Sequence, residues 1–127
     1  MVYNNILLID DDADDQEIFE SVLNDVSESP TFTSFTNAYD ALQKLDRREL
    51  NPDVIFLDLN MPITTRQEFL MEIKKRDLIK DIPVIIFSTT SNSLTIQLMK
   101  EMGAIDFITK PDRFDKLVTI LKCILNQ

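Results

Sequence analysis

Polar side chains that can do chemistry follow three short apolar runs and one further short segment. These residues are Asp10, Asp11 and Asp12 after residues 6–9, Asp58 after 54–57, Ser88 after 84–87, and Lys110 after 105–108. Carboxylates held within about 4–6 Å of one another are unfavourable unless a cation lies among them. Oxygen ligands without His or Cys suit Mg²⁺, Mn²⁺ or Ca²⁺, and few protein ligands with room for water favour Mg²⁺. If the ends of these runs meet, their residues predict a Mg²⁺ site.

The same residue types suit phosphoryl transfer. Mg²⁺ commonly shares its coordination sphere with a phosphate oxygen. Lys110 would pair with that phosphoryl group as a point charge, and the hydroxyl of Ser88 would donate one hydrogen bond to it. Asp58 is then left as the nucleophile, which would form an acyl phosphate. Catalysis would come mainly from position and electrostatics.

The elements that must position these residues follow from the apolar pattern. The runs at 6–9, 54–57 and 84–87 are apolar throughout, which is typical of strands buried on both faces of a parallel sheet. We predict two more strands at 31–35 and 105–108, the first at an edge because it is more polar. A helix with an apolar stripe follows each strand, and Asp12, Asn37 and Asp112 are predicted to cap three of them.

This alternation predicts an α/β fold, a doubly wound, five-stranded parallel sheet with helices on both faces and right-handed crossovers. The carboxyl ends of all five strands then open on one edge, where ligands bind in such sheets. Asp10, Asp58, Ser88 and Lys110 are therefore expected to converge there.

Length and composition exclude several classes of protein. The 127 residues predict one domain, spanning residues 1–127, with a substantial core. The net charge of −9 argues against binding nucleic acid, which needs clustered Lys and Arg. The chain has no histidine, so a general base or metal ligand has to be a carboxylate.

The remaining composition points to the cytoplasm. No segment approaches the roughly 20 consecutive apolar residues of a membrane span, and the N-terminus lacks the basic flank of a signal peptide. Cys123 is the one cysteine, so no internal disulfide can form. Its place in an apolar helical pattern predicts a core residue. A reducing compartment fits these features.

Together the motifs resemble the receiver domains of bacterial two-component response regulators, over the whole chain. The run at 6–9 with its aspartates is similar to the family's first strand and acidic pair. Val54 to Pro62 resembles the phosphoacceptor strand, with Asp58 in the acceptor position. Phe87-Ser88 matches the fourth strand with its switch hydroxyl, and Phe107 to Pro111 matches the fifth strand with its lysine and proline.

The resemblance implies a CheY-like, single-domain response regulator with a flavodoxin-like sheet of strand order 2-1-3-4-5. It implies Mg²⁺ as cofactor and a phosphoryl group that comes from a histidine kinase, a histidine phosphotransfer protein or a small phosphodonor. The implied ligands of Mg²⁺ are Asp11 directly, Asp10 through water, Asp58, and Asn60 through its backbone carbonyl. Ser88 and Phe107 would form a coupled switch, and the bond before Pro111 would be cis.

Three features depart from the family pattern. Arg66 stands where a glycine is usual, so the loop after Asp58 is expected to differ. Thr89 stands where Ala or Gly is usual, and we hypothesise that it narrows access to the acceptor and slows phosphate exchange. No effector domain is expected after the last helix, because the chain stops at Gln127.

A receiver without an effector domain would signal through its surface. Apolar residues spread around more than half the circumference of the helix at 94–102. We therefore expect phosphorylation to switch a partner-binding surface formed by helix four, strand five and helix five. The alternative is that these residues are core and scattered surface.

Three other functions use the same residues less well. A pseudo-receiver would bind partners without phosphorylation, yet every position that phosphoryl transfer needs is intact. A phosphohydrolase with an aspartyl nucleophile would need a second aspartate two residues after Asp58, where Asn60 stands. A flavin carrier would cradle phosphate after the first strand, where three aspartates repel it.

Overall fold

Five strands alternate with five helices along the chain. The computed structural model describes residues 3–26, 31–58, 63–77, 79–89, 92–111 and 113–125, and for 63–66 the backbone alone. The strands are β1 (Asn5–Ile9), β2 (Thr31–Phe35), β3 (Val54–Leu57), β4 (Val84–Ser88) and β5 (Asp106–Thr109). The helices are α1 (Ala13–Val26), α2 (Ala38–Asp46), α3 (Ile63–Lys75), α4 (Ser93–Glu101) and α5 (Phe114–Leu125).

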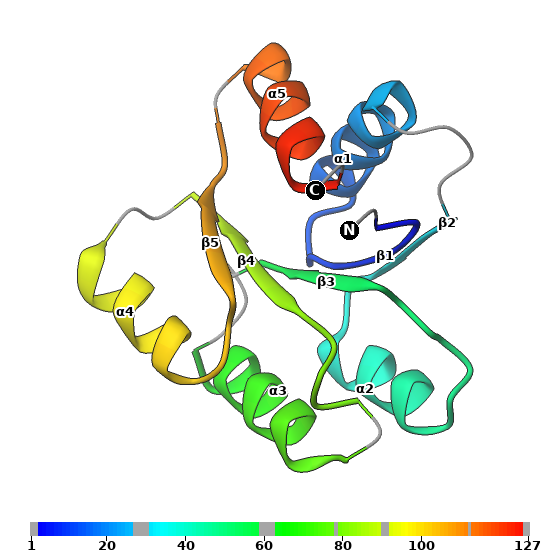
Figure 1. Ribbon diagram of the computed structural model, residues 1–127, viewed down its shortest axis with the longest axis vertical. Helices are drawn as coiled ribbons and strands as arrows, with labels where there is room; N and C mark the ends of the chain where they lie inside the picture. The colour runs from blue at the N-terminus through cyan, green and yellow to red at the C-terminus, as the bar shows by residue number, and fades with distance from the viewer. Residues whose placement is uncertain are drawn as a thin grey trace.

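The strands form one parallel sheet in the order β2-β1-β3-β4-β5, as predicted (Figure 1). β2 lies at an edge and is only partly buried, whereas every residue of β3 and β4 is buried. Each predicted strand boundary lies within one residue of the observed boundary. For example, β4 also includes Ser88, and β5 begins at Asp106 rather than at Ile105. The flavodoxin-like fold is thereby confirmed.

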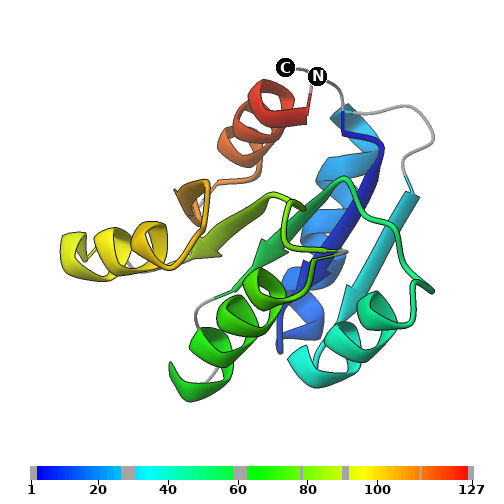
Figure 2. The same cartoon turned by 60° about the horizontal axis from the view of Figure 1, so that its bottom comes forward.

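The helices cover both faces of the sheet. α1 and α5 lie on one face, and α2, α3 and α4 lie on the other (Figures 1 and 2). Successive residues of a strand point to opposite faces. In β1, Ile6 and Leu8 therefore pack in the core beneath α1 and α5, whereas Leu7 and Ile9 pack in the core beneath the other three helices.

Side-chain caps fix where the helices begin. Asp12 accepts hydrogen bonds through Oδ1 from the backbone N–H groups of Asp14, at 2.9 Å, and Asp15, at 3.3 Å. Asn37 caps α2 in the same way. These two predicted caps are confirmed, while the predicted cap at Asp112 lies outside the described residues.

The apolar pattern misassigned Cys123 to the core, and it also includes a half-exposed residue of α1. Cys123 is exposed, so the prediction that it belongs to the core is wrong. α5 buries Leu117, Leu121 and Leu125, and a residue two positions after Leu121 lies about 200° around the helix, facing away from the sheet. Ile18 is 48% exposed, because the stripe of α1 that packs on the sheet is centred on Phe19, Val22 and Leu23.

Phe19 anchors α1 to the sheet, which gives a first prediction. Its ring lies 5.0 Å from that of Phe56 and 5.6 Å from that of Phe87, measured between centroids. We expect Phe19→Ala to lower the free energy of unfolding by about 3–5 kcal/mol, because it leaves a cavity among buried rings. Ile18→Ala, one residue away and half exposed, should cost less than about 1 kcal/mol. Urea denaturation measures both, and equal losses would contradict this account of the packing.

Candidate functional site

The register of the sheet brings Asp10 and Asp58 together. Ile9 of β1 pairs with Leu57 of β3, and each aspartate is the first residue after its strand. The backbone N–H of Asp58 donates to the carbonyl of Ile9 at 3.0 Å, and that of Asp10 donates to the carbonyl of Phe35 at 3.0 Å. Three neighbouring strand ends are therefore tied together where the two carboxylates emerge.

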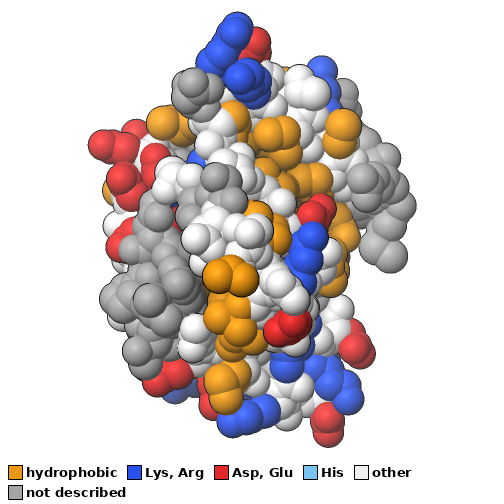
Figure 3. Space-filling view, turned by 90° about the vertical axis from the view of Figure 1, so that its left-hand side faces the viewer, with side chains coloured by type: hydrophobic (Ala, Val, Ile, Leu, Met, Phe, Trp, Pro, Cys, Tyr) orange, Lys and Arg blue, Asp and Glu red, His pale blue; other side chains and the backbone are white. Residues whose placement is uncertain are grey.

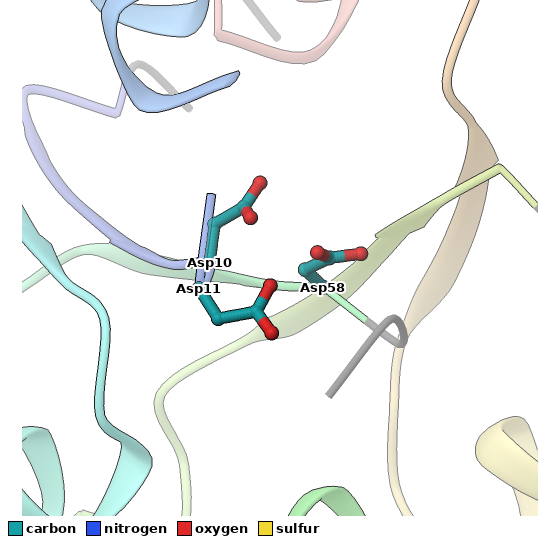
Figure 4. Close-up of side chains that lie close together, drawn as sticks. All are labelled: Asp10, Asp11 and Asp58. Carbon is teal, nitrogen blue, oxygen red and sulfur yellow. The ribbon is translucent and has the colours of Figure 1, made fainter. Parts of the chain in front are cut away.

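Asp10, Asp11 and Asp58 form an acidic cluster. Each offers a carboxylate oxygen, and these oxygens lie within 4.8 Å of one another. Figure 4 shows the three side chains gathered at the ends of β1 and β3. Asp10 and Asp58 are buried, whereas Asp11 is exposed, so the cluster opens to solvent on one side. Such an oxygen-only set fits a hard divalent cation with room for water ligands, and the cluster can therefore bind a metal.

Lys110 brings a positive charge to this cluster. Its Nζ lies 3.0 Å from Asp15, 3.1 Å from Asp10 and 3.5 Å from Asp58, in each case from Oδ2. The lysine side chain is only 10% exposed. Because Ser88 pairs with Thr109, Lys110 directly follows the last pair of β4 and β5, and its backbone N–H donates to the carbonyl of Ser88 at 2.6 Å.

The carboxylates keep the ammonium charged. Burial by itself lowers the pKa of Lys110, but hydrogen bonds to Asp15 and Asp10 and the charges of Asp58 and Asp10 outweigh burial and raise this pKa above its ordinary value. The ammonium also lies 5.4 Å from the centroid of the Phe87 ring, within range of a cation–π interaction.

The bond that follows Lys110 differs from expectation. None of the peptide bonds among the described residues is cis, so the prediction of a cis bond before Pro111 is wrong. The trans form is the lower-energy form of a bond to proline. The lysine reaches the carboxylates with this bond in the trans form.

Two polar residues at the site were not predicted from the sequence. Asp15 contacts Lys110 from the first turn of α1. Gln16 donates through Nε2 to the backbone carbonyls of Asp10, at 2.6 Å, and Phe35, at 3.1 Å, and so ties α1 to two strand ends. Their position in the first turn after the acidic run was the available signal, but acidic and polar residues are common in the first turn of a helix, where they suit its dipole.

The other predicted residues lie around this edge in different environments. Ser88 is fully buried, Thr89 is exposed, and Phe107 is partly buried against the core beneath α2, α3 and α4. Asn60 and the side chain of Arg66 lie outside the described part of the chain. The structure therefore places Asp10, Asp11, Asp58 and Lys110 in one site and leaves the ligand role of Asn60 as a prediction.

A separate cavity of about 440 Å³ lies between α2 and α3. Its charged groups are already paired with one another. Arg76 forms ion pairs with Asp46, at 2.7 Å, and Glu72, at 2.9 Å, and the hydroxyl of Tyr39 donates to Glu68 at 2.5 Å. Of the predicted site residues that the structure describes, none lines this cavity. Among the helices in the described part of the chain, none has the length and apolar character needed to span a membrane.

Comparison with known proteins identifies one family. The family model of the response regulator receiver domain matches residues 6–122. A curated relative, protein-glutamate methylesterase/protein-glutamine glutaminase 1 of Syntrophomonas wolfei, is 34% identical over 113 residues, which cover 87% of this chain and 31% of the relative. The chain thus spans about a third of the length of this curated relative.

Two solved structures share the fold over nearly all of the chain. One is the phosphorylated cyanobacterial phytochrome response regulator RcpA, with a TM-score of 0.84 and 27% identity, covering 97% of this chain and 91% of that one. The other is the Mn(2+)-bound form of response regulator Rcp1, with a TM-score of 0.81 and 25% identity, covering 95% and 91%.

The acidic cluster makes a prediction about divalent cations. A cation that binds only the folded protein stabilises it, by about 2.7 kcal/mol at 100 times its Kd. We expect Mn²⁺ to raise the melting temperature, and Asp11→Asn to weaken the effect strongly, because Asp11 supplies an exposed oxygen to the cluster. Asp14→Asn removes the same charge from an exposed position outside the cluster and should respond like the wild type. If Asp11→Asn shows the same rise in melting temperature with Mn²⁺ as Asp14→Asn and the wild type, the cation binds elsewhere.

Proposed function

Because the chain belongs to the response regulator receiver domain family, we propose that it is a phosphorylation switch whose acceptor is Asp58. Receiver domains take phosphoryl groups from histidine kinases in two-component signalling. The observation that carries the proposal is the position of Asp58. Its carboxylate is buried at the end of β3, shares the acidic cluster and lies 3.5 Å from the ammonium of Lys110.

The transfer that we propose conserves atoms and charge. A carboxylate oxygen of Asp58 attacks the phosphorus of a phosphohistidine, a P–O bond forms, and the P–N bond breaks. The electron pair of that bond returns to the imidazole ring of the partner, which leaves as neutral histidine because its other ring nitrogen already carries a proton. Lys110 pairs with the phosphoryl oxygens, and the hydroxyl of Ser88 donates one hydrogen bond to them.

Mg²⁺ is the cofactor that we propose for this step, where it would neutralise charge on the phosphoryl oxygens. Asp11 would hold the ion directly and Asp10 through water, with Asp58 and the backbone carbonyl of Asn60 completing the protein ligands. The chemistry of the cluster supports this assignment, since all its donors are oxygens and one side is open. The Mn²⁺-bound form of Rcp1 and the phosphorylated form of RcpA support it from the structural relatives.

We propose that the chain catalyses only its own phosphorylation and dephosphorylation. The relative from Syntrophomonas wolfei is named as an esterase, but the match covers 31% of it and falls on the receiver domain. A phosphohydrolase remains a less favoured alternative. Turnover of a small phosphoester in excess would distinguish it from a switch.

The partners that we propose are a histidine kinase or histidine phosphotransfer protein upstream and a protein target downstream, in the cytoplasm. The net charge of −9 disfavours nucleic acid and an anionic membrane surface as partners.

The output surface that we propose is formed by α4, β5 and α5. Leu94 and Leu98 of α4 are 75% and 42% exposed, Ile105 is 56% exposed, and Phe114 of α5 is 50% exposed. Figure 3, viewed from the side of α4, shows hydrophobic side chains gathered between charged groups. Ser88 and Phe107 would couple the acceptor to this surface. Ser88 ends β4, the strand beside β3, and Phe107 lies in β5, which is part of the surface.

Phosphorylation of Asp58 is directly testable. We expect acetyl phosphate with Mg²⁺ to add the mass of one phosphoryl group, and Asp58→Asn to abolish that addition because an amide oxygen does not form the acyl phosphate. Intact mass spectrometry measures both proteins, with omission of Mg²⁺ as a further control. A wild type that takes up no phosphoryl group would favour the pseudo-receiver, and a labelled Asp58→Asn variant would place the acceptor elsewhere.

The switch can be followed by hydrogen exchange. We expect beryllofluoride, a phosphoryl mimic, to change the protection of backbone amides in residues 88–110, because α4 and β5 would shift between two arrangements. Amides of β1 should serve as an internal control, since this strand lies deep in the sheet. An unaltered pattern at 88–110 in a protein that binds the mimic would exclude this output route.

A further inference from the structure

We propose that Asp15 is a positioning residue that gives Lys110 a counter-ion of its own, holding the ammonium beside Asp58 while a divalent cation occupies the acidic cluster. The inference rests on the proposed function, because it concerns the same phosphoryl transfer. Nothing in the acceptor or metal assignments involves Asp15.

The contact between the two residues is short and geometrically defined. Oδ2 of Asp15 lies 3.0 Å from Nζ of Lys110, a distance shorter than the 3.5 Å that separates this nitrogen from Asp58. An ammonium group has three N–H donors. It meets three carboxylates here, of which Asp10 and Asp58 belong to the metal cluster and Asp15 does not.

Charge balance explains why the third carboxylate matters. When a divalent cation binds the cluster, it competes with the ammonium for the negative charge of Asp10 and Asp58, and the two cations repel each other. When Asp58 becomes an acyl phosphate, it no longer offers a carboxylate to the lysine. Asp15 is then the carboxylate that still holds Lys110 at the site, and at 37% exposure its charge is only partly screened by solvent.

The backbone around Asp15 is well anchored. Its own N–H donates to Asp12 at 3.3 Å, and the next residue, Gln16, binds the carbonyls of Asp10 and Phe35. The first turn of α1 is thus tied to the ends of β1 and β2. Asp15 is therefore held in place by the backbone and can fix the position of the Lys110 ammonium, whose residue lies in the loop after β5.

The test compares Asp15→Asn with Asp14→Asn in the full chain. Both remove one negative charge from the same helical turn, but the side chain of Asp14 is exposed and makes none of the contacts to Lys110. At saturating Mg²⁺ we expect Asp15→Asn to slow labelling of Asp58 by acetyl phosphate by roughly fivefold, as for a partly exposed charged hydrogen bond. Asp14→Asn should stay within about twofold of the wild type, and Asp15→Glu should recover part of the rate.

A double-mutant cycle separates positioning of Lys110 from a general effect on the fold. In a Lys110→Met background, Asp15→Asn should cause no further loss of rate, because the group it acts through is gone. Binding of beryllofluoride, followed by ¹⁹F NMR, gives a second readout that does not need turnover and should show the same non-additivity. Urea unfolding of each variant checks that the protein measured is folded.

The outcomes are distinguishable. If the wild type is labelled and Asp15→Asn matches Asp14→Asn in both readouts, the role of Asp15 is overturned while the proposed function stands. An additive loss in the Lys110→Met background would also overturn it, since Asp15 would then act independently of the lysine. If the wild type is not labelled and does not bind beryllofluoride, the proposed function fails and this inference fails with it.

Discussion

The structure depends on how buried negative charge is balanced at one edge of the sheet. Asp10 and Asp58 are fully buried, and an isolated buried carboxylate costs several kcal/mol. The ammonium of Lys110 is shared among these two residues and Asp15. One monovalent cation cannot neutralise three carboxylates and the neighbouring Asp11. The remaining negative charge makes this edge attractive to a divalent cation. This excess of negative charge also links metal binding to the phosphoryl chemistry proposed for Asp58.

Much of this arrangement was predictable, because it follows from strand alternation and parallel pairing. Unbroken apolar runs identified the central strands, and the polar residue after each run had to emerge at the common edge. Residues 6 and 8, 54 and 56, and 108 face α1 and α5. Asp10, Asp58 and Lys110 continue this alternation by two residues, so they converge on one side of the edge. The register, in which Ile9 pairs with Leu57, places Asp10 and Asp58 side by side at the ends of neighbouring strands.

What the sequence could not predict depends on the rotation of helices and on side-chain reach. Helical periodicity shows that one face is apolar, but the residues at the margins of that face are settled only when the helix docks on the sheet. Ile18 lies at such a margin and Cys123 lies on the opposite face of α5, and both are exposed. A carboxylate at the position of Asp15 also suits the N-terminus of a helix, so its sequence position does not single it out. Only the folded structure, which brings Lys110 from 95 residues later in the chain, shows that Asp15 is an ion-pair partner of this lysine.

The helices are not equally well anchored, and the weak anchoring of α4 bears on signalling. α1 and α5 each bury three residues on their face of the sheet, whereas α4, all of whose residues are described, buries only Met99. Shifting a helix costs less when fewer apolar contacts must be broken. α4 also follows β4, the strand that ends in Ser88, and packs beside β5, which carries Phe107. A change of charge at Asp58 would therefore reach, through these two strands, the helix that can move at the lowest cost.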